Sequence, residues 1–286
     1  MKKIYVSVAS IFFASAIVVG CNAQPASQDD ILINQIGYPV DAAKKGLIRG
    51  NVESFFIKDA GGNVVFEGEV SEPKYWELSG DAVGVADFSA LTQTGNFTLC
   101  VEDICSYSFE IGENLYSDLA DAAIKSYYYA RVGVDIEKEF GGKWNYKAGH
   151  PDTEVLIHAS AADEHRPEGS TISSPGGWYD AGDYGKYIVN SSITTWTILQ
   201  SYRMNSDFHT SQSLNIPESV NDLPDILDEA LVNLKWMMTM QDPNDGGVYH
   251  KLTTKNFDAF IMPDETTNPR YVMMKSTSAA LICSAL

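Results

Sequence analysis

The spacing of apolar residues changes near Gly112, and this change most constrains the fold. Before it, short runs alternate between apolar and polar residues, separated by clusters of Gly, Asn, Asp and Thr. Such a pattern is typical of a small antiparallel sandwich. After it, apolar residues recur at intervals of three and four, the period of an amphipathic helix. The sequence therefore predicts a multidomain β + α protein, with a sandwich over residues 31–112 and a mostly helical region over residues 113–286.

The same runs locate individual elements. Asp222 stands where the N-cap of one helix belongs, and Pro224 is tolerated in a first turn. The carboxylates that follow, Asp225, Asp228 and Glu229, are expected on a solvated helix face. The expected strands are 31–33, 54–57, 64–66, 97–99 and 107–111, and the expected helices are 115–127, 191–202, 223–238 and 273–286.

The N-terminal segment has the features of an export signal. Residues 1–20 begin with two lysines after Met and continue as an uncharged apolar run that is short for a membrane span. The run ends in Val-Val-Gly before Cys21, like a bacterial lipobox, which predicts cleavage there and a lipid on the Cys21 sulfur. Residues 21–30 would then be a polar linker. We expect an outer-membrane or cell-surface lipoprotein, or, if Cys21 is incidental, a periplasmic or secreted protein.

Two cysteines in the first region are candidates for a disulfide, because an exported chain meets oxidising conditions. If Glu102 and Asp103 form a two-residue turn, Cys100 faces Cys105 within disulfide range. The alternative is a pair of free buried thiols. Cys283 lies in an apolar helical run and is expected in the core.

The charge balance excludes some partners. With 20 Lys and Arg against 38 Asp and Glu, the net charge is −18, and such a field repels nucleic acid. It also disfavours anionic membrane surfaces, so membrane attachment is expected only through the lipid anchor. A neutral substrate or calcium is compatible with this charge. Fifteen Tyr and five Trp offer flat faces on which sugar rings stack, although most will be core.

One stretch combines carboxylates, glycines and aromatic residues. Residues 176–187 read GGWYDAGDYGKY, which places Asp180 and Asp183 three residues apart. The segment 140–177 before it has few apolar repeats, and a loop that long is usually functional. Two nearby carboxylates can share one water, and one of them can act as a general base. Alternatively, the pair caps a turn or forms part of a calcium site.

The wider sequence resembles glycoside hydrolase family 9, the inverting cellulases. The resemblance implies a barrel of six helix pairs, (α/α)6, with an open cleft for a β-1,4-glucan chain, of which residues 113–286 would be the first part. It further identifies residues 31–112 as an immunoglobulin-like module. The motifs that carry the resemblance are 176–187, 222–230 (DLPDILDEA), 240–241 with 246–251 (GGVYHK), 126–131 (SYYYAR) before 141–144, and 34–38 (NQIGY).

The resemblance also implies roles for the motif. Asp183 would be the base that activates water, and Asp180 would help to hold that water. The reaction would be a single displacement with inversion, with a carboxylic acid about 6.5–9.5 Å away protonating the leaving oxygen. Trp178 and Tyr179 adjoin the aspartates and are candidates to stack on a glucosyl ring. Alternatively, one of them packs beneath the loop, and Tyr179 is favoured for the cleft.

The family's general acid is a Glu near the end of the barrel, and the resemblance places it beyond residue 286. Neither Glu229 nor Glu265 matches its motif. The sequence stops within an apolar helix and looks cut off, so this chain alone is expected to be inactive. A non-catalytic glycan-binding surface protein is the rival hypothesis. The choice among cellulose, xyloglucan and mixed-linkage glucan stays open.

No cofactor is required by this chemistry. Some relatives with the module hold zinc through cysteines where this chain has Val132 and Gly149, so no metal site is expected here. His150 and His158 are solitary and are expected to be hydrogen-bonded loop residues. Structural calcium is common in the family, but its ligands cannot be placed on this sequence.

Overall fold

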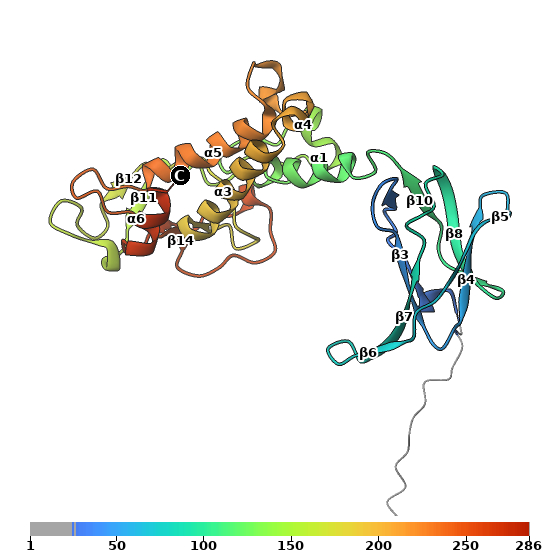
Figure 1. Ribbon diagram of the computed structural model, residues 1–286. Coiled ribbons are helices and arrows are strands. Elements are labelled where there is room, and N and C mark those ends of the chain that lie inside the picture. The colour runs from blue at the N-terminus through green and yellow to red at the C-terminus, as the bar shows by residue number, and fades with distance from the viewer. Residues whose placement is uncertain (1–24, 26, 286) are drawn as a thin grey trace, which may run out of the picture. The chain divides into compact units, whose positions relative to one another are not determined.

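The computed structural model describes residue 25 and residues 27–285 (Figure 1). The predicted signal peptide and Cys21 lie outside the described residues. The chain divides into two compact units between Tyr116 and Ser117, a few residues after the predicted boundary at Gly112. Within the described part, no helix is both long and apolar enough to cross a membrane.

The first unit is a sandwich of two sheets, as predicted. One sheet has the strand order β1-β3-β7-β6, and the other has the order β2-β10-β8-β4-β5 with β9 beside β8. The strands are β1 (Ile31–Leu32), β2 (Tyr38–Pro39), β3 (Lys45–Arg49), β4 (Ser54–Asp59), β5 (Val64–Glu69), β6 (Lys74–Trp76), β7 (Asp81–Asp87), β8 (Gly95–Val101), β9 (Ile104–Cys105) and β10 (Phe109–Gly112). The prediction missed β2, β3, β6 and β7. The sandwich is also not wholly antiparallel as predicted, because β2 and β10 run parallel.

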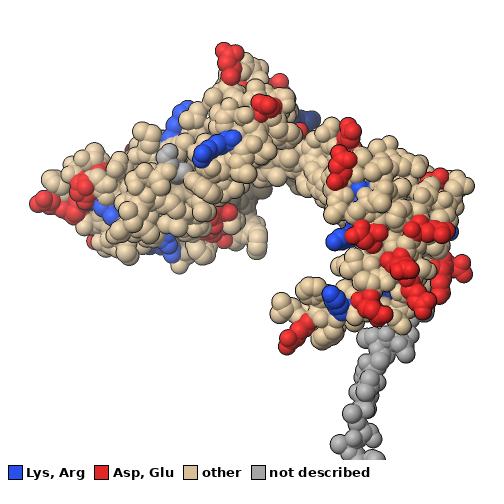
Figure 2. Space-filling view, viewed as in Figure 1, with Lys and Arg blue, Asp and Glu red and all other residues tan. Residues whose placement is uncertain are grey.

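Alternation along the strands builds the core of the sandwich. Ile48 on β3 and Ile57 on β4 are fully buried and belong to one apolar cluster, although they come from different sheets. The hairpin of β8 and β9 has the predicted register: Val101 lies opposite Ile104, and Cys100 lies opposite Cys105 in a disulfide. Acidic side chains gather on the visible face of this unit (Figure 2).

The second unit contains the helices. The longest, α3, packs against both α5 and α6. The helices are α1 (Ser117–Lys125), α2 (Lys138–Gly141), α3 (Ile188–Met204), α4 (Ser206–Ser211), α5 (Asp225–Thr239) and α6 (Thr277–Cys283), with short 3-10 helices η1 (Gln28–Asp30, in the first unit), η2 (Tyr128–Ala130), η3 (Gly142–Trp144), η4 (Ala159–Ala161), η5 (Pro217–Val220) and η6 (Pro263–Glu265).

The starts of all four predicted helices are shifted by two to four residues, and two of these shifts have a clear local cause. Asp222 is not a cap, because the side chain of Asn221 accepts a hydrogen bond from Leu223 N at 2.6 Å and makes a turn there. Helix α5 begins after Pro224. Helix α6 starts later than residue 273, because β15 ends just before it, and Ser276 caps the helix by accepting from Ala279 N.

A five-stranded sheet completes the second unit. Its order is β12-β11-β15-β14-β13, and it was not predicted, because pieces of two to four residues carry no readable period. Two of its strands lie within the segment expected to be a loop. The strands are β11 (Val155–Ile157), β12 (Thr171–Ile172), β13 (Lys186–Tyr187), β14 (Lys251–Thr254) and β15 (Arg270–Val272). Strand β13 leads directly into α3, so the sheet fixes the end of the aspartate motif.

The acidic residues of α5 are buried, which contradicts the expected solvated face. Glu229 is fully buried, and its Oε1 accepts from Arg131 Nη2 at 2.7 Å. Asp225 Oδ2 accepts from Leu214 N at 2.6 Å. Each carboxylate thus has partners that repay its loss of water. Arg131 lies 98 residues before Glu229, and Leu214 lies 11 residues before Asp225, outside the helix, so the helical period did not reveal either partner.

Candidate active site

The aspartate motif forms a loop that is anchored from below. Gly176 and Gly177 have φ of +77° and +79°, a region that favours glycine. A Cβ on Gly177 would lie 2.7 Å from Trp236 Cγ, so the loop can pack on Trp236 only with glycine there. Lys186 Nζ, beneath the loop, donates to the carbonyl oxygens of Ser174 and Gly176, each at 2.9 Å.

A buried ionic network ties this loop to two distant segments. Asp152 Oδ2 lies 2.7 Å from Lys186 Nζ, and Asp152 Oδ1 lies 2.9 Å from Arg270 Nε. Arg270 Nη1 also donates to Tyr184 O at 2.5 Å. Burial lowers the pKa of Lys186 to about 8, against the attraction of Asp152. The network therefore holds the motif rigidly at its base.

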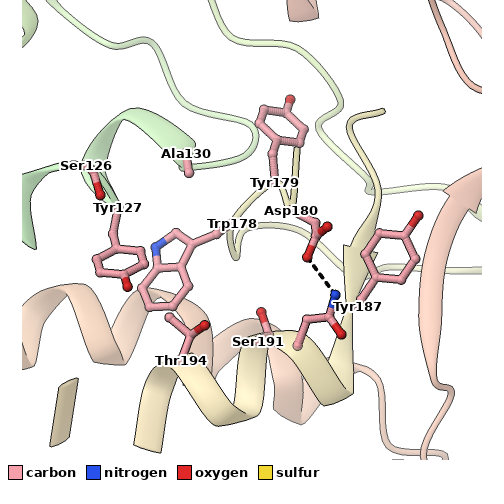
Figure 3. Close-up of a pocket in the computed structure, with 10 residues that line it drawn as sticks. Ser126, Tyr127, Ala130, Trp178, Tyr179, Asp180, Tyr187, Ser191 and Thr194 are labelled. Carbon is pink, nitrogen blue, oxygen red and sulfur yellow. Dashed lines mark hydrogen bonds between the residues drawn. The ribbon is translucent and has the colours of Figure 1, made fainter. Parts of the chain in front are cut away.

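The two aspartates have different surroundings. Asp180 is exposed, and its Oδ1 accepts from Asn190 Nδ2 at 2.9 Å, the dashed line in Figure 3. Asp183 is partly buried, and its Oδ2 accepts from the Tyr187 hydroxyl at 2.5 Å. Asp183 Oδ1 is buried and has no hydrogen-bond partner among the described residues. Each carboxylate thus accepts, through one oxygen, a hydrogen bond from a side chain at the start of α3.

Two pockets border Asp180, and both are lined by Ala130, Tyr179 and Asp180. One has a volume of about 250 Å³ and is drawn in Figure 3, and the other has a volume of about 310 Å³. The first is further lined by Ser126, Tyr127, Trp178, Tyr187, Asn190, Ser191 and Thr194, and the second by Tyr129, Tyr146, Ala181, Gly182, Tyr184, Met262 and Pro263. Aromatic rings beside hydroxyl and carboxylate groups suit a sugar, which offers both apolar faces and hydroxyls.

Trp178 and Tyr179 take different positions beside the aspartates. Trp178 is only 4% exposed, and its ring lies 4.8 Å from that of Tyr127, centroid to centroid (Figure 3). Tyr179 is partly exposed between the two pockets, and its hydroxyl lies 2.8 Å from His150 Nδ1. Stacking of either ring on substrate stays a prediction.

Sequence comparison assigns both units. The model of the cellulase N-terminal ig-like domain matches residues 26–106, and the model of glycosyl hydrolase family 9 matches residues 116–286. The chain belongs to glycosyl hydrolase family 9. It is 44% identical, over 99% of its length, to a xyloglucan-specific endo-β-1,4-glucanase of Bacteroides ovatus, of which it covers 49%. It is 31% identical, over 87% of its length, to endoglucanase D of Acetivibrio thermocellus, of which it covers 39%.

Structural comparison agrees. A solved family 9 structure from Bacteroides ovatus matches with a TM-score of 0.85 and 46% identity, over 90% of this chain and 47% of that one. The chain thus spans about half the length, or less, of these relatives. The likeness extends over the sandwich and the helical unit, so it supports the whole described fold.

The zinc site of some family 9 proteins does not fit this chain. Val132 is an apolar side chain, and a Cβ on Gly149 would lie 2.0 Å from Pro263 O, so that space is already filled. Only His150 remains as a donor, and one imidazole does not make a zinc site. Within the described residues, no group of three or more His, Cys, Asp or Glu is arranged to hold a metal. Calcium binding stays a prediction without assigned ligands.

The two histidines have structural surroundings. Burial and nearby Arg270 lower the pKa of His150 to about 4, so its imidazole is neutral beside Tyr179. Its φ of +52° marks a strained backbone next to the motif. His158 accepts from Ser160 N at 3.1 Å and caps the short helix η4.

Sequence reasoning missed several residues of this site. Tyr187 is the last residue of the motif and Asn190 follows three residues later. Both contact the aspartates, and their nearness could have been read from the sequence. Lys186 is in the motif too, but nothing marked it as buried. Asp152 and Arg270 carried no signal, because they come to the loop only through the unpredicted sheet.

Proposed function

We propose that the protein carrying this chain hydrolyses β-1,4-glucosidic bonds of a glucan by single displacement with inversion. The observation that carries the proposal is the pair Asp180 and Asp183 on one glycine-flanked loop, with Asp180 lining two pockets and Asp183 held by the Tyr187 hydroxyl. Oδ1 of Asp183 has no hydrogen-bond partner among the described residues, so no other protein group occupies the lone pairs that would take the proton. The names of the two relatives, a xyloglucan-specific endo-β-1,4-glucanase and an endoglucanase, support this substrate class.

The proposed chemistry uses the aspartates in sequence. Asp183 takes a proton from a water as the water oxygen attacks the anomeric carbon, and Asp180 accepts the second hydrogen bond of that water. The bond from the anomeric carbon to the glycosidic oxygen breaks, and a carboxylic acid about 6.5–9.5 Å away protonates the leaving oxygen. The product then has the opposite anomeric configuration.

We assign the acid to neither candidate glutamate. Burial raises the pKa of Glu229, as in many general acids, but Arg131 opposes this shift and donates to both carboxylate oxygens, to Oε1 at 2.7 Å and to Oε2 at 3.3 Å. Glu229 is therefore structural. Glu265 is exposed, and its Oε2 accepts from Met262 N at 3.0 Å in the first turn of η6.

Product stereochemistry and one substitution test this function. The complete gene product should release α-anomers first from β-1,4-linked oligosaccharides, as followed by proton NMR. Asp183→Asn keeps the shape but cannot take the proton, so kcat should fall about 10²–10⁴-fold with little change in KM. Asp180→Asn should reduce kcat less.

Asp207→Asn, an exposed change on α4, is the matched control for the loss of one charge. If Asp183→Asn kept wild-type turnover, the base would be misassigned and Asp180 would be the next candidate. Oligosaccharide binding without any hydrolysis by the unaltered protein would support the glycan-binding hypothesis instead.

We further propose that Cys21, outside the described residues, carries a lipid that anchors the exported protein. The apolar run before Cys21 and the polar linker after it support this proposal. Metabolic labelling with a palmitate analogue should mark the protein in its native host. Cys21→Ser should abolish the label and release the protein from the membrane fraction. Label that persists in Cys21→Ser would end the idea.

A further inference from the structure

The hydroxyl of Tyr187 distinguishes the two oxygens of Asp183. Oδ2 accepts from that hydroxyl at 2.5 Å, whereas Oδ1 is buried without a partner among the described residues. A carboxylate pinned through one oxygen cannot rotate freely, so the other oxygen keeps a fixed direction. The contact therefore does more than stabilise the loop: it leaves Oδ1 as the oxygen whose lone pairs no described residue occupies.

The donor itself is held in place by the fold. Tyr187 is the last residue of β13, where it pairs with Lys251, and it directly precedes α3. The next residue, Ile188, donates its N–H to His250 O at 2.9 Å. Lys251 Nζ lies 5.8 Å from the centre of the Tyr187 ring. Sheet and helix thus fix the phenol, while the aspartate sits on the loop.

Gly185 provides the space for this contact. A Cβ there would lie 2.8 Å from the Tyr187 hydroxyl oxygen and 2.9 Å from Asp183 Oδ2. Gly185 is not among the glycines with positive φ, so the backbone does not require glycine. The hydrogen bond is what requires it, because any other side chain would stand between its two partners.

We propose that Tyr187 is a positioning residue that makes Oδ1 of Asp183 the oxygen that accepts the proton of the attacking water. The proposal rests on the proposed function. Oδ2 keeps its bond to the phenol while Oδ1 receives the proton, and no other bond changes. Burial, and then the hydrogen bond to Asp183, raise the pKa of Tyr187 to about 12, so the phenol is a donor throughout the neutral range.

Two substitutions in the complete gene product remove the contact from opposite sides. Tyr187→Phe deletes the hydroxyl and keeps the ring, and Gly185→Ala drives the partners apart. Each should lower kcat about 10–100-fold, the scale of one hydrogen bond to a charged group, with KM changed less than about twofold. Tyr202→Phe on the same helix is the control, since it deletes the same atom roughly 22 Å along the axis.

Azide rescue separates positioning from other roles. In Asp183→Ala, azide can attack the anomeric carbon without a base, forming the inverted glycosyl azide as the leaving oxygen takes its proton from the acid. Adding Tyr187→Phe to that variant should change the azide rate less than about twofold, because no carboxylate remains to be positioned.

The outcomes distinguish this proposal from the function on which it rests. Unchanged kcat in Tyr187→Phe, or an equal loss with and without Asp183, would overturn the role of Tyr187 alone. Failure of azide to rescue Asp183→Ala would instead count against Asp183 as the base. If Gly185→Ala were inactive while Tyr187→Phe kept wild-type kcat, the loop of the alanine variant would be misfolded. The kcat of Tyr187→Phe would then decide against the role of Tyr187.

Discussion

Buried charged residues meet at two places inside the second unit. Asp152, Lys186 and Arg270 meet beneath the aspartate loop, and Arg131 meets Glu229 elsewhere in the unit. Removing one partner of such a group leaves an uncompensated charge, which is far more costly than losing an exposed ion pair. These residues therefore constrain one another, and each is a poor site for substitution even though none touches the pockets.

His150 should make stability depend on pH. Its pKa is about 4 in the folded protein against 6.5 unfolded, so the unfolded state binds more protons between these values. The contribution of His150 to the free energy of unfolding is thus fully present above pH 6.5. It is lost as the pH drops to about 4, which lowers the free energy of unfolding by about 3 kcal/mol. Lys186 and Arg270 favour the neutral imidazole, and Asp152 opposes them.

We expect His150→Asn to remove this loss of unfolding free energy between pH 6.5 and 4, because Asn does not titrate. Asn also tolerates a positive φ. Urea unfolding of the complete gene product between pH 4 and 7.5 measures the effect. His165→Gln, at an exposed site, is the control and should leave the pH dependence of the unfolding free energy unchanged. An unchanged pH dependence in His150→Asn would show that other groups cause it.

At the scale of elements, length decided what could be predicted. Helix α3 and helix α5 span several turns, so their apolar period was clear in the sequence. Strands β11 and β15 have three residues each, and their partners lie far along the chain. The candidate site shows the same division: the aspartates were found within a local motif, whereas Asp152 and Arg270 reach them only through that sheet.

The β8–β9 hairpin should owe part of its stability to the disulfide. With a sequence separation of 5, the bridge closes a small loop, so its loss should cost about 2 kcal/mol through the entropy of the unfolded chain. The double variant Cys100→Ala and Cys105→Ala should lower the unfolding midpoint of the first unit in urea. Cys283→Ala, in the second unit, should leave that midpoint unchanged. Equal midpoints with and without reductant would contradict the prediction.

At the scale of the whole molecule, the two units should differ in autonomy. The sandwich buries one apolar cluster between its two sheets, with residues contributed by both. The helical unit leaves large apolar side chains in solvent, among them Ile193 and Trp196 on α3 and Met238 on α5, which are 57%, 49% and 77% exposed. Exposed apolar surface of this kind promotes association.

Expressed separately, residues 27–116 should therefore melt cooperatively, whereas residues 117–286 should aggregate or bind a hydrophobic dye. Calorimetry and dye fluorescence of the two pieces measure this. A sharp, reversible melt of residues 117–286 without dye binding would refute the prediction for that unit.

The ionic network under the aspartate loop also sets an order of events during synthesis. Asp152 and Arg270 are 118 residues apart, and strand β11 needs β15 as its neighbour. At about 5–20 residues per second, a ribosome takes roughly 6–24 s to deliver the second partner after the first. Throughout that interval the nascent chain holds Asp152 without Arg270. The site is therefore assembled late, and a synonymous change that slows translation between the two codons should lengthen the time in which chaperones and proteases can reach it.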